Sequence, residues 1–191
     1  MKVGLFFGSF NPVHTGHMII ANHLVEYSDL DQVWMVVSPH NPLKNKASLA
    51  KDSDRYHLVQ IAIGDHPKIK ASNVEFFLPQ PSYTIDTLIF LQEKYPKKSF
   101  ALIMGGDSLE SIEKWKNFEI LLADYDIYLY QRPGTNTAKY ANSDRVKIVE
   151  APLLDISATF IRNALKDRKS IRYLVPDSVY EYLESSSMYR K

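Results

Sequence analysis

The chain has no cysteine among its 191 residues, which excludes disulfide bonds, thiolate nucleophiles and cysteine-ligated zinc. It also lacks any apolar run close to the ~18 residues that a membrane-spanning helix needs. The apolar start, MKVGLFF, is too short for a signal peptide and is followed at once by Gly8 and an Asn-Pro pair. From these absences we expect a cytoplasmic protein that makes no membrane contact.

An excess of charge of either sign is missing as well. Lys and Arg number 23 and Asp and Glu number 22, which gives a formal net charge of +1. Because nucleic-acid-binding domains normally carry a clustered basic face, we expect no nucleic-acid partner. No repeat and no long Pro-, Gly- or Ser-rich linker divides the chain, so we expect one domain over residues 1–191, with residues 185–191 as a frayed tail.

Short β-branched or aromatic runs alternate along the chain with longer segments of helical period. We expect strands at residues 3–7, 33–37, 68–71, 74–77, 100–104, 127–130 and 146–149. We expect helices at residues 15–27, 54–63, 84–95, 157–166 and 176–183, and one or two helices within 107–123. This alternation predicts an α/β fold, a Rossmann-like doubly wound parallel sheet with helices on both faces. In such a sheet, ligands bind outside the carboxyl ends of the strands.

Residues 8–17, GSFNPVHTGH, connect the first expected strand to the first expected helix. Helix N-termini attract phosphates through their free N–H groups and the helix dipole, and Gly8 lets the backbone approach a nucleotide closely. Gly16 separates His14 from His17, which project from one face if both are helical. Histidine suits a phosphate site because it donates hydrogen bonds and takes up charge near neutral pH. The alternatives are a tight turn with one core and one exposed histidine, or a metal site, against which the lack of a carboxylate at ligand spacing argues.

Residues 156–162, ISATFIR, form a second expected helix N-terminus. The hydroxyl of Ser157 and nearby backbone N–H groups suit phosphate oxygens, and Arg162 suits a bidentate contact with a phosphate group. The alternative is an ordinary capped helix with a surface arginine. The strongest signal is the presence of both segments in one chain.

The two segments resemble the H-x-G-H and I-S-x-T-x-I-R signatures of the nucleotidyltransferase superfamily, in the form used by nicotinate mononucleotide adenylyltransferases. The resemblance covers residues 3–162, and the chain departs from the usual family pattern at Ser9 and Asn11, which affects the adjacent backbone contacts. It implies that the AMP part of ATP is transferred to nicotinate mononucleotide with release of pyrophosphate, a step of NAD biosynthesis. It also implies Mg²⁺ bound through the ATP phosphates, and no metal held by the protein itself.

The resemblance assigns roles to individual residues. The catalytic set is His14, His17, Ser157 and Arg162. The ATP-binding set is Gly8, Ser9, Phe10, His14, Gly16, His17, Gly105, Asp107, Arg132, Ile156, Ser157, Thr159 and Arg162. The acceptor-binding set is Lys44, Tyr83, Thr84, Asp86 and Trp115, where Trp115 would stack on the pyridine ring. Several of these have plainer explanations that remain open: a solvated Lys44, helix capping by Thr84, Asp86 and Asp107, and a core Trp115.

Two other functions stay open. One is transfer to another phosphate acceptor, either nicotinamide mononucleotide or phosphopantetheine. The phosphopantetheine relatives usually carry T-x-G-H at the position of His14 and lack the ISxTxIR pattern, which argues against that acceptor. The other is a non-catalytic ATP sensor on the same fold, against which the intact His14, His17, Ser157 and Arg162 argue. The oligomeric state does not follow from the sequence.

Overall fold

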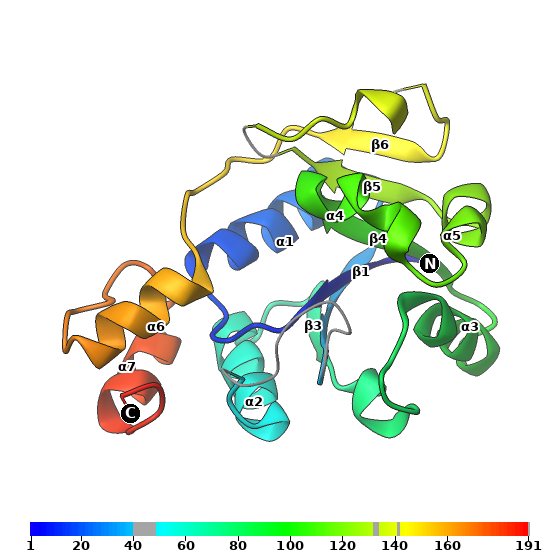
Figure 1. The fold of residues 1–191 in the computed structure, drawn as a ribbon. Coiled ribbons are helices and arrows are strands. Elements are labelled where there is room, and N and C mark those ends of the chain that lie inside the picture. The colour runs from blue at the N-terminus through cyan, green and yellow to red at the C-terminus, as the bar shows by residue number, and fades with distance from the viewer. Residues whose placement is uncertain (40–48, 132–133, 141, 191) are drawn as a thin grey trace.

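The computed structural model describes residues 1–39, 49–131, 134–140 and 142–190. A six-stranded sheet runs through the molecule in the order β3-β2-β1-β4-β5-β6, and each neighbouring pair is parallel (Figure 1). Its strands are β1 (Lys2–Gly8), β2 (Gln32–Val37), β3 (Ile69–Ser72), β4 (Ser99–Gly105), β5 (Ile127–Tyr130) and β6 (Val146–Val149). The predicted doubly wound α/β fold is confirmed.

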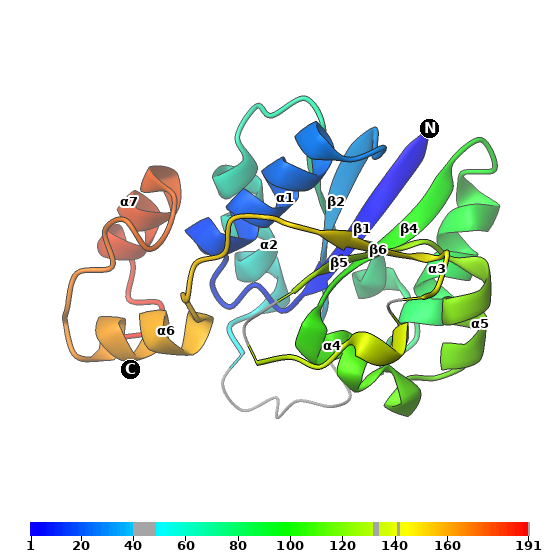
Figure 2. The same ribbon diagram turned by 90° about the horizontal axis from the view of Figure 1, so that it is seen from above.

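Helices pack on both faces of the sheet, so the central strands are covered on each side and read as continuous apolar runs. One face is covered by α1 (Thr15–Tyr27) and α2 (Asp52–Ile63), and α6 (Ala158–Lys166) and α7 (Asp177–Ser185) belong to the same core cluster as these helices. The other is covered by α3 (Thr84–Lys94), α4 (Gly106–Glu110) and α5 (Phe118–Asp124). The helices α6 and α7 lie together at one side of the molecule, beyond α1 and α2 (Figures 1 and 2). No helix in the described ranges has the length and apolar content needed to cross a membrane; the cytoplasmic location stays a prediction.

The strand order reverses between β1 and β4, which are hydrogen-bonded neighbours in the centre of the sheet. The chain moves outward from β1 through β2 to β3, then returns to β4 and moves outward in the other direction. A crevice forms at such a switch point, outside the carboxyl ends of the two strands. The first motif follows β1, and the segment that starts at Gly105 follows β4, so both lie at this crevice.

The expected strand at 74–77 is wrong: these residues form a 3₁₀ helix, η2 (Val74–Phe77). A short run of this kind does not distinguish strand from helix by its period. Here Glu75 is 2% exposed while Phe77 is 77% exposed, the reverse of what the polarity of the two side chains suggests. The expected helical region 107–123 holds α4 and α5, with a second 3₁₀ helix, η3 (Ile112–Lys114), between them. A third, η4 (Ala138–Tyr140), follows β5.

The C-terminal residues beyond α7 dock onto the body of the protein instead of fraying. Met188 and Tyr189 pack against the core cluster on the α1 side of the sheet. The hydroxyl of Tyr189 donates to Oδ1 of Asn11 over 2.8 Å, a contact between residues 178 positions apart. The end of the chain therefore reaches the loop that follows β1.

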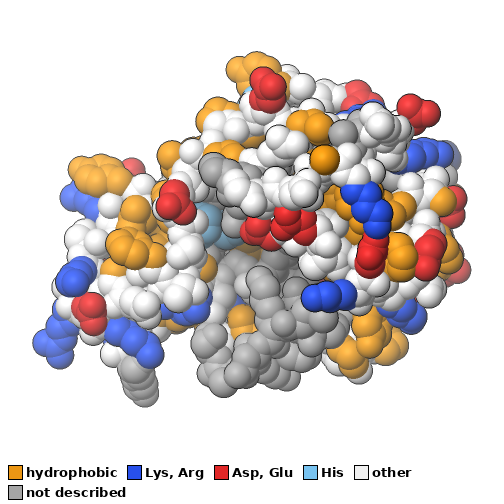
Figure 3. All heavy atoms as spheres, turned by 45° about the horizontal axis from the view of Figure 1, so that its top comes forward, with side chains coloured by type: hydrophobic (Ala, Val, Ile, Leu, Met, Phe, Trp, Pro, Cys, Tyr) orange, Lys and Arg blue, Asp and Glu red, His pale blue; other side chains and the backbone are white. Residues whose placement is uncertain are grey.

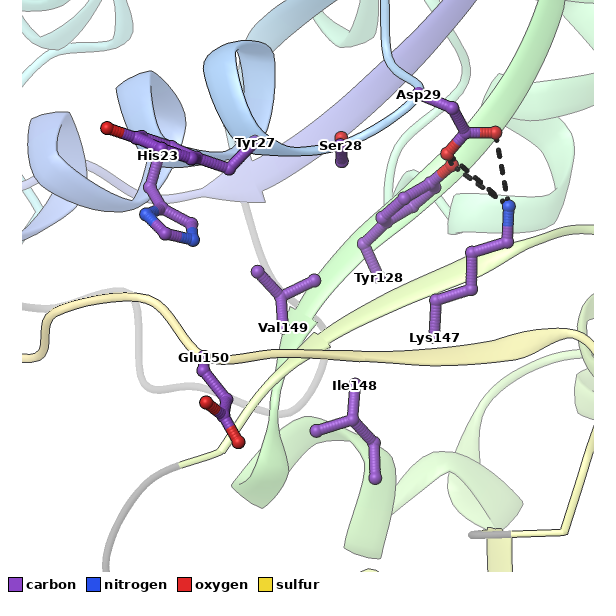
Figure 4. A pocket seen from close by; sticks show the side chains of 9 residues that line it. All are labelled: His23, Tyr27, Ser28, Asp29, Tyr128, Lys147, Ile148, Val149 and Glu150. Atoms are coloured by element: carbon purple, nitrogen blue, oxygen red, sulfur yellow. Dashed lines mark hydrogen bonds and ion pairs between the residues drawn. The ribbon is translucent and has the colours of Figure 1, made fainter.

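A cluster of charges links the amino ends of β1, β5 and β6, at the opposite end of the sheet from the crevice. The ammonium of Lys2 donates to Asp126 over 2.6 Å and to Asp29 over 2.8 Å. Lys147 lies beside Asp29 and the Tyr128 hydroxyl (Figure 4). The hydrogen bond from Lys2 lowers the pKa of Asp126, and partial burial of that carboxyl opposes the shift.

We predict that this cluster makes the fold sensitive to acid. A carboxyl whose pKa is lowered by folding binds fewer protons in the native state, so it stabilises the fold at pH values above the ordinary Asp pKa of about 3.9. That stabilisation is lost as the pH falls below this value. Asp126→Asn should lower the free energy of unfolding at pH 7 by about 1–2 kcal/mol, and should make stability fall less steeply than in the parent between about pH 4 and pH 2.

Denaturant unfolding at a series of pH values measures this. The control is Asp65→Asn, which changes an exposed carboxylate in the turn after α2 and should reproduce the parent curve. The prediction would be contradicted if the free energies of unfolding of the parent and of Asp126→Asn fell equally steeply below pH 4.

Candidate active site

The first junction places two histidines in contact at the start of α1. His14 is the N-cap residue with an extended backbone, and His17 lies in the first turn. Their rings stack with centroids 3.6 Å apart. The backbone N–H of His14 donates to Nδ1 of His17 over 3.2 Å, so in the neutral ring Nε2 carries the proton and acts as the donor. The two rings thus lie side by side although His14 is not helical, so helical spacing alone does not account for their contact.

Aromatic packing explains the two glycines of this junction. A Cβ at Gly8 would lie 2.8 Å from the ring of Phe10, and one at Gly16 would lie 3.2 Å from the ring of His14. Phe10 is 1% exposed, and its ring meets that of His17 edge-on at 5.0 Å. The Phe10 ring thus packs against the His17 ring. Because the Phe10 side chain is buried, only its backbone is available for the predicted contact with ATP. Ser9 lies half-buried beside it, where its carbonyl accepts a hydrogen bond from Arg55.

The second junction reaches the first through Arg162. Its Nη1 donates to the backbone carbonyl of Asn11 over 2.8 Å, across 151 residues of sequence. Its Nη2 donates to Oγ1 of Thr159 over 3.2 Å, so Thr159 orients the guanidinium. Ser157 is the N-cap of α6 as expected, and its hydroxyl oxygen accepts from the N–H of Phe160 over 3.1 Å. A capping oxygen of this kind keeps its own proton for donation, so the capping and phosphate-binding interpretations are compatible.

Figure 3 shows histidine side chains in a hollow on one face of the molecule, with acidic side chains beside them. The half-buried Ile156 precedes Ser157 and packs against the same core cluster as α1. Because Arg162 donates to the carbonyl of Asn11, three residues before His14, the imidazoles of the early motif and the guanidinium of the late one border one region.

Asn11, one of the two departures from the family pattern, is a buried junction of several segments. Its Oδ1 accepts from the backbone N–H of Ala50 over 3.1 Å and from the hydroxyl of Tyr189 over 2.8 Å. Its carbonyl accepts from Arg162. Asn11 therefore connects the loop after β1 to the start of α2, to α6 and to the C-terminus.

The exit of β4 lies next to this junction because β4 pairs with β1. A Cβ at Gly105 would lie 3.0 Å from the ring of Tyr130, and one at Gly106 only 2.3 Å from Oγ1 of Thr135. Gly105 thus allows close packing of the last residue of β5, and Gly106 allows close packing of the chain after β5. Asp107 lies exposed in the first turn of α4, whose N-cap residue is Gly105, so the alternative of Asp107 as N-cap is wrong.

The predicted acceptor residues that the structure describes form a group at the start of α3. Tyr83 is the N-cap residue of α3, Thr84 is its first residue, and Asp86 lies in the first turn. Lys116 forms an ion pair with Asp86 at 2.8 Å and lies 5.0 Å from the centre of the Tyr83 ring. The neighbouring Trp115 packs against the core on this side, and its buried Nε1 has no hydrogen-bond partner among the described residues. Contacts of Lys116 therefore bring the α3 segment and the tryptophan segment together.

Two buried charged residues near these segments escaped the sequence analysis. Glu75 accepts from the hydroxyl of Thr87 over 2.9 Å, and burial raises the pKa of its carboxyl. Nothing in its sequence context indicated burial. Arg55 is fully buried on α2. Its position three and four residues before Leu58 and Val59 places it on the buried face of a helix, and that was an available signal.

Lys44 and Arg132 lie outside the described residues, so their predicted roles stay predictions. A separate hollow of about 320 Å³ lies between α1 and the strands β5 and β6 (Figure 4). Its lining includes His23, Tyr27 and Lys147 and none of the predicted site residues. Among the described residues, no group of three or more His, Asp or Glu side chains is placed to bind a metal ion.

Comparison with known proteins agrees with this architecture. The family described as cytidylyltransferase-like matches residues 5–164. A protein of Flavobacterium psychrophilum named a probable nicotinate-nucleotide adenylyltransferase is 52% identical, with 100% of both chains covered. One of the same name from Bacteroides fragilis is 44% identical, covering 94% of this chain and 90% of its own.

Among solved structures, the nicotinic acid mononucleotide adenylyltransferase of Plasmodium falciparum complexed with NaAD superposes with a TM-score of 0.82. The match covers 98% of this chain and 97% of that one at 18% identity, and so demonstrates the shared fold. The full-length matches at about 50% identity show the family as well as the fold. The chain belongs to the nicotinate-nucleotide adenylyltransferases, within the cytidylyltransferase-like family.

Proposed function

We propose that the chain joins the AMP part of ATP to nicotinate mononucleotide, releasing pyrophosphate and forming nicotinate adenine dinucleotide, with His14, His17, Ser157 and Arg162 around the triphosphate. The observation that carries these roles is the hydrogen bond from Arg162 to the carbonyl of Asn11. It brings the guanidinium of the late motif to the loop that leads directly into His14 and His17. One triphosphate can therefore contact both motifs.

The acceptor phosphate is already an anion, so it needs no general base to become a nucleophile. Its oxygen attacks the α-phosphorus of ATP, and pyrophosphate leaves on the opposite side. The protein must position two anions against their mutual repulsion and stabilise charge on the leaving group. We assign His17 to the α- and β-phosphate region because Nε2 is its donor nitrogen, with His14 stacked beside it.

The start of α6 is the proposed binding site of the leaving pyrophosphate. The N-terminal N–H groups and dipole of this helix favour a bound anion. Ser157 donates its hydroxyl proton there, and Arg162 adds a positive charge whose direction is set by Asn11 and Thr159. Since this charge is already oriented before ATP arrives, little reorganisation is needed as charge develops.

Mg²⁺ fits this site as an ion carried by the substrate. Its ligands would be phosphate oxygens and water. When bound, it would offset negative charge on the phosphates.

The start of α3 is the proposed position of the acceptor base. Backbone N–H groups near Thr84 would receive the nicotinate carboxylate, and Trp115 would stack on the pyridine ring. Tyr83 and Asp86 would shape the same region through their contacts with Lys116. Lys44 would meet the acceptor phosphate and Arg132 the nucleotide.

Pyrophosphate release with ATP and a panel of acceptors tests this function. We expect the highest kcat/KM with nicotinate mononucleotide, a lower value with the nicotinamide form, and no turnover with phosphopantetheine. Turnover with phosphopantetheine alone would reassign the acceptor. Binding of ATP with no product from any acceptor would indicate a sensor instead.

For His17→Ala we predict a fall of about 10²-fold or more in the chemical step, the scale for loss of a transition-state donor. Single-turnover rates with saturating substrates measure this step. His23→Ala is the matched control, because His23 lies on the same helix and stacks on Tyr27 at 4.7 Å, away from the site. A His17→Ala rate within a few-fold of the parent would remove His17 from this role.

For Trp115→Ala we predict a rise of about 10- to 100-fold in KM for the mononucleotide, since stacking of a base on an aromatic ring is worth roughly 1–3 kcal/mol. KM for ATP should stay near the parent value, and Trp115→Phe should retain most of the affinity. Trp34→Ala is the control for lost packing, because Trp34 packs against the same core cluster. Equal rises in both KM values would show that Trp115 acts through the fold.

A further inference from the structure

Arg55 is a fully buried cation in which every N–H group meets an acceptor. Nε donates to the carbonyl of Ala50 over 3.1 Å. Nη1 donates to the carbonyls of Ser9 and, over 3.0 Å, of Ser38. Nη2 donates to the carbonyl of Pro39 over 3.5 Å and to Oδ1 of Asp52 over 2.7 Å. A guanidinium has five N–H donors in a fixed plane, and here five oxygens accept from them.

One of these oxygens belongs to the loop proposed to bind ATP, and the others belong to segments that flank the residue proposed for the acceptor phosphate in sequence. Ser9 lies in the loop after β1 that leads to His14 and His17. Ser38 and Pro39 follow β2 directly, and Ala50 precedes α2, so the Arg55 contacts lie on both sides of residues 40–48 in sequence. Lys44, the residue proposed for the acceptor phosphate, belongs to that intervening stretch.

The same contacts continue to the second motif. The backbone N–H of Ala50 donates to Oδ1 of Asn11, while the Ala50 carbonyl accepts from Arg55. The Asn11 carbonyl in turn accepts from Arg162. A continuous chain of hydrogen bonds therefore runs from Arg55 through Ala50 and Asn11 to the guanidinium proposed for the leaving group.

We infer that Arg55 is a positioning residue that sets the distance between the ATP loop after β1 and the acceptor segment after β2. This inference rests on the proposed function, because it needs both substrates to bind at those segments. Arg55 is buried and touches neither substrate. It acts on the alignment of the acceptor phosphate with the α-phosphorus, where small misplacements cost large factors in rate.

Stability alone is a poor explanation for a group of this kind. Burial of a charge carries a large desolvation penalty, and apolar residues of similar size often serve a fold as well or better. A guanidinium instead supplies directional donors to several carbonyls at once, which an ammonium with three donors does not reproduce. Geometry, more than charge, is therefore what Arg55 contributes.

The test compares Arg55→Lys and Arg55→Met with Leu58→Ala in the full chain. Leu58 is fully buried on the same helix and packs in the core, so Leu58→Ala is a control for lost stability. Each variant is assayed for kcat and both KM values at a temperature well below its Tm, and for equilibrium binding of ATP without acceptor.

We expect kcat to fall by about 10²-fold in Arg55→Met and by at least about 10-fold in Arg55→Lys, which keeps the charge and loses donors. ATP binding without acceptor should change by less than about 3-fold, since the proposed ATP contacts at the start of α6 do not involve Arg55 directly. Leu58→Ala should retain kcat within about 3-fold despite a lower Tm. If Arg55→Met does not fold, Arg55→Lys decides the question.

Parent-like kcat in Arg55→Lys or Arg55→Met would overturn the positioning role, as would a kcat loss in Leu58→Ala that matches theirs at an equal drop in Tm. A kcat loss in the Arg55 variants accompanied by an equal loss of ATP affinity would also overturn it, because Arg55 would then stabilise only the loop proposed to bind ATP. If the parent itself forms no dinucleotide from ATP and nicotinate mononucleotide, it is the proposed function that fails.

Discussion

Two neighbouring parallel strands, β1 and β4, continue at their carboxyl ends into connections that leave the sheet in opposite directions. The crevice between them follows from that topology, because neither crossover passes over it. Parallel strands also direct the helices that follow them so that their N-termini point towards this edge. The starts of α1 and α4 therefore combine free N–H groups with the positive ends of two helix dipoles. The proposed binding of phosphates at this site therefore depends first on chain topology.

The second motif reaches this edge by packing. α6 follows the edge strand β6, and the chain returns across the molecule to the side of α1 and α2 (Figure 1). Its buried residues Ile161 and Leu165 join the same core cluster as Ile20 of α1 and Leu58 of α2. Burial of this apolar face positions α6, and Arg162, one residue after Ile161, then meets the Asn11 carbonyl. Hydrophobic burial of α6 thus determines where the charge of Arg162 lies.

The cluster of ion pairs and the candidate active site lie at opposite ends of the sheet. At the amino ends, Lys2, Asp29 and Asp126 pair with one another, and those charges offset each other. At the carboxyl ends, the guanidinium groups of Arg55 and Arg162 donate to backbone carbonyls of the loops after β2 and β1. Arg55 also forms an ion pair with Asp52, which offsets its charge, whereas the carbonyl of Asn11 orients the guanidinium of Arg162 without neutralising it.

Local sequence was enough for features whose causes lie within a few residues. Gly8, His14 and His17 at a strand-to-helix junction, Ser157 as a helix cap, and the alternation of buried strands with helices all depend on near neighbours. The roles of Arg55, Glu75 and Tyr189 depend on partners 46, 12 and 178 residues away, which no period or cap reveals. The contact of Arg162 with Asn11 joins residues 151 positions apart, so local sequence does not predict it either. Only the packed fold determines which loops meet, because hydrophobic burial of the helices and the pairing order of the strands select those neighbours.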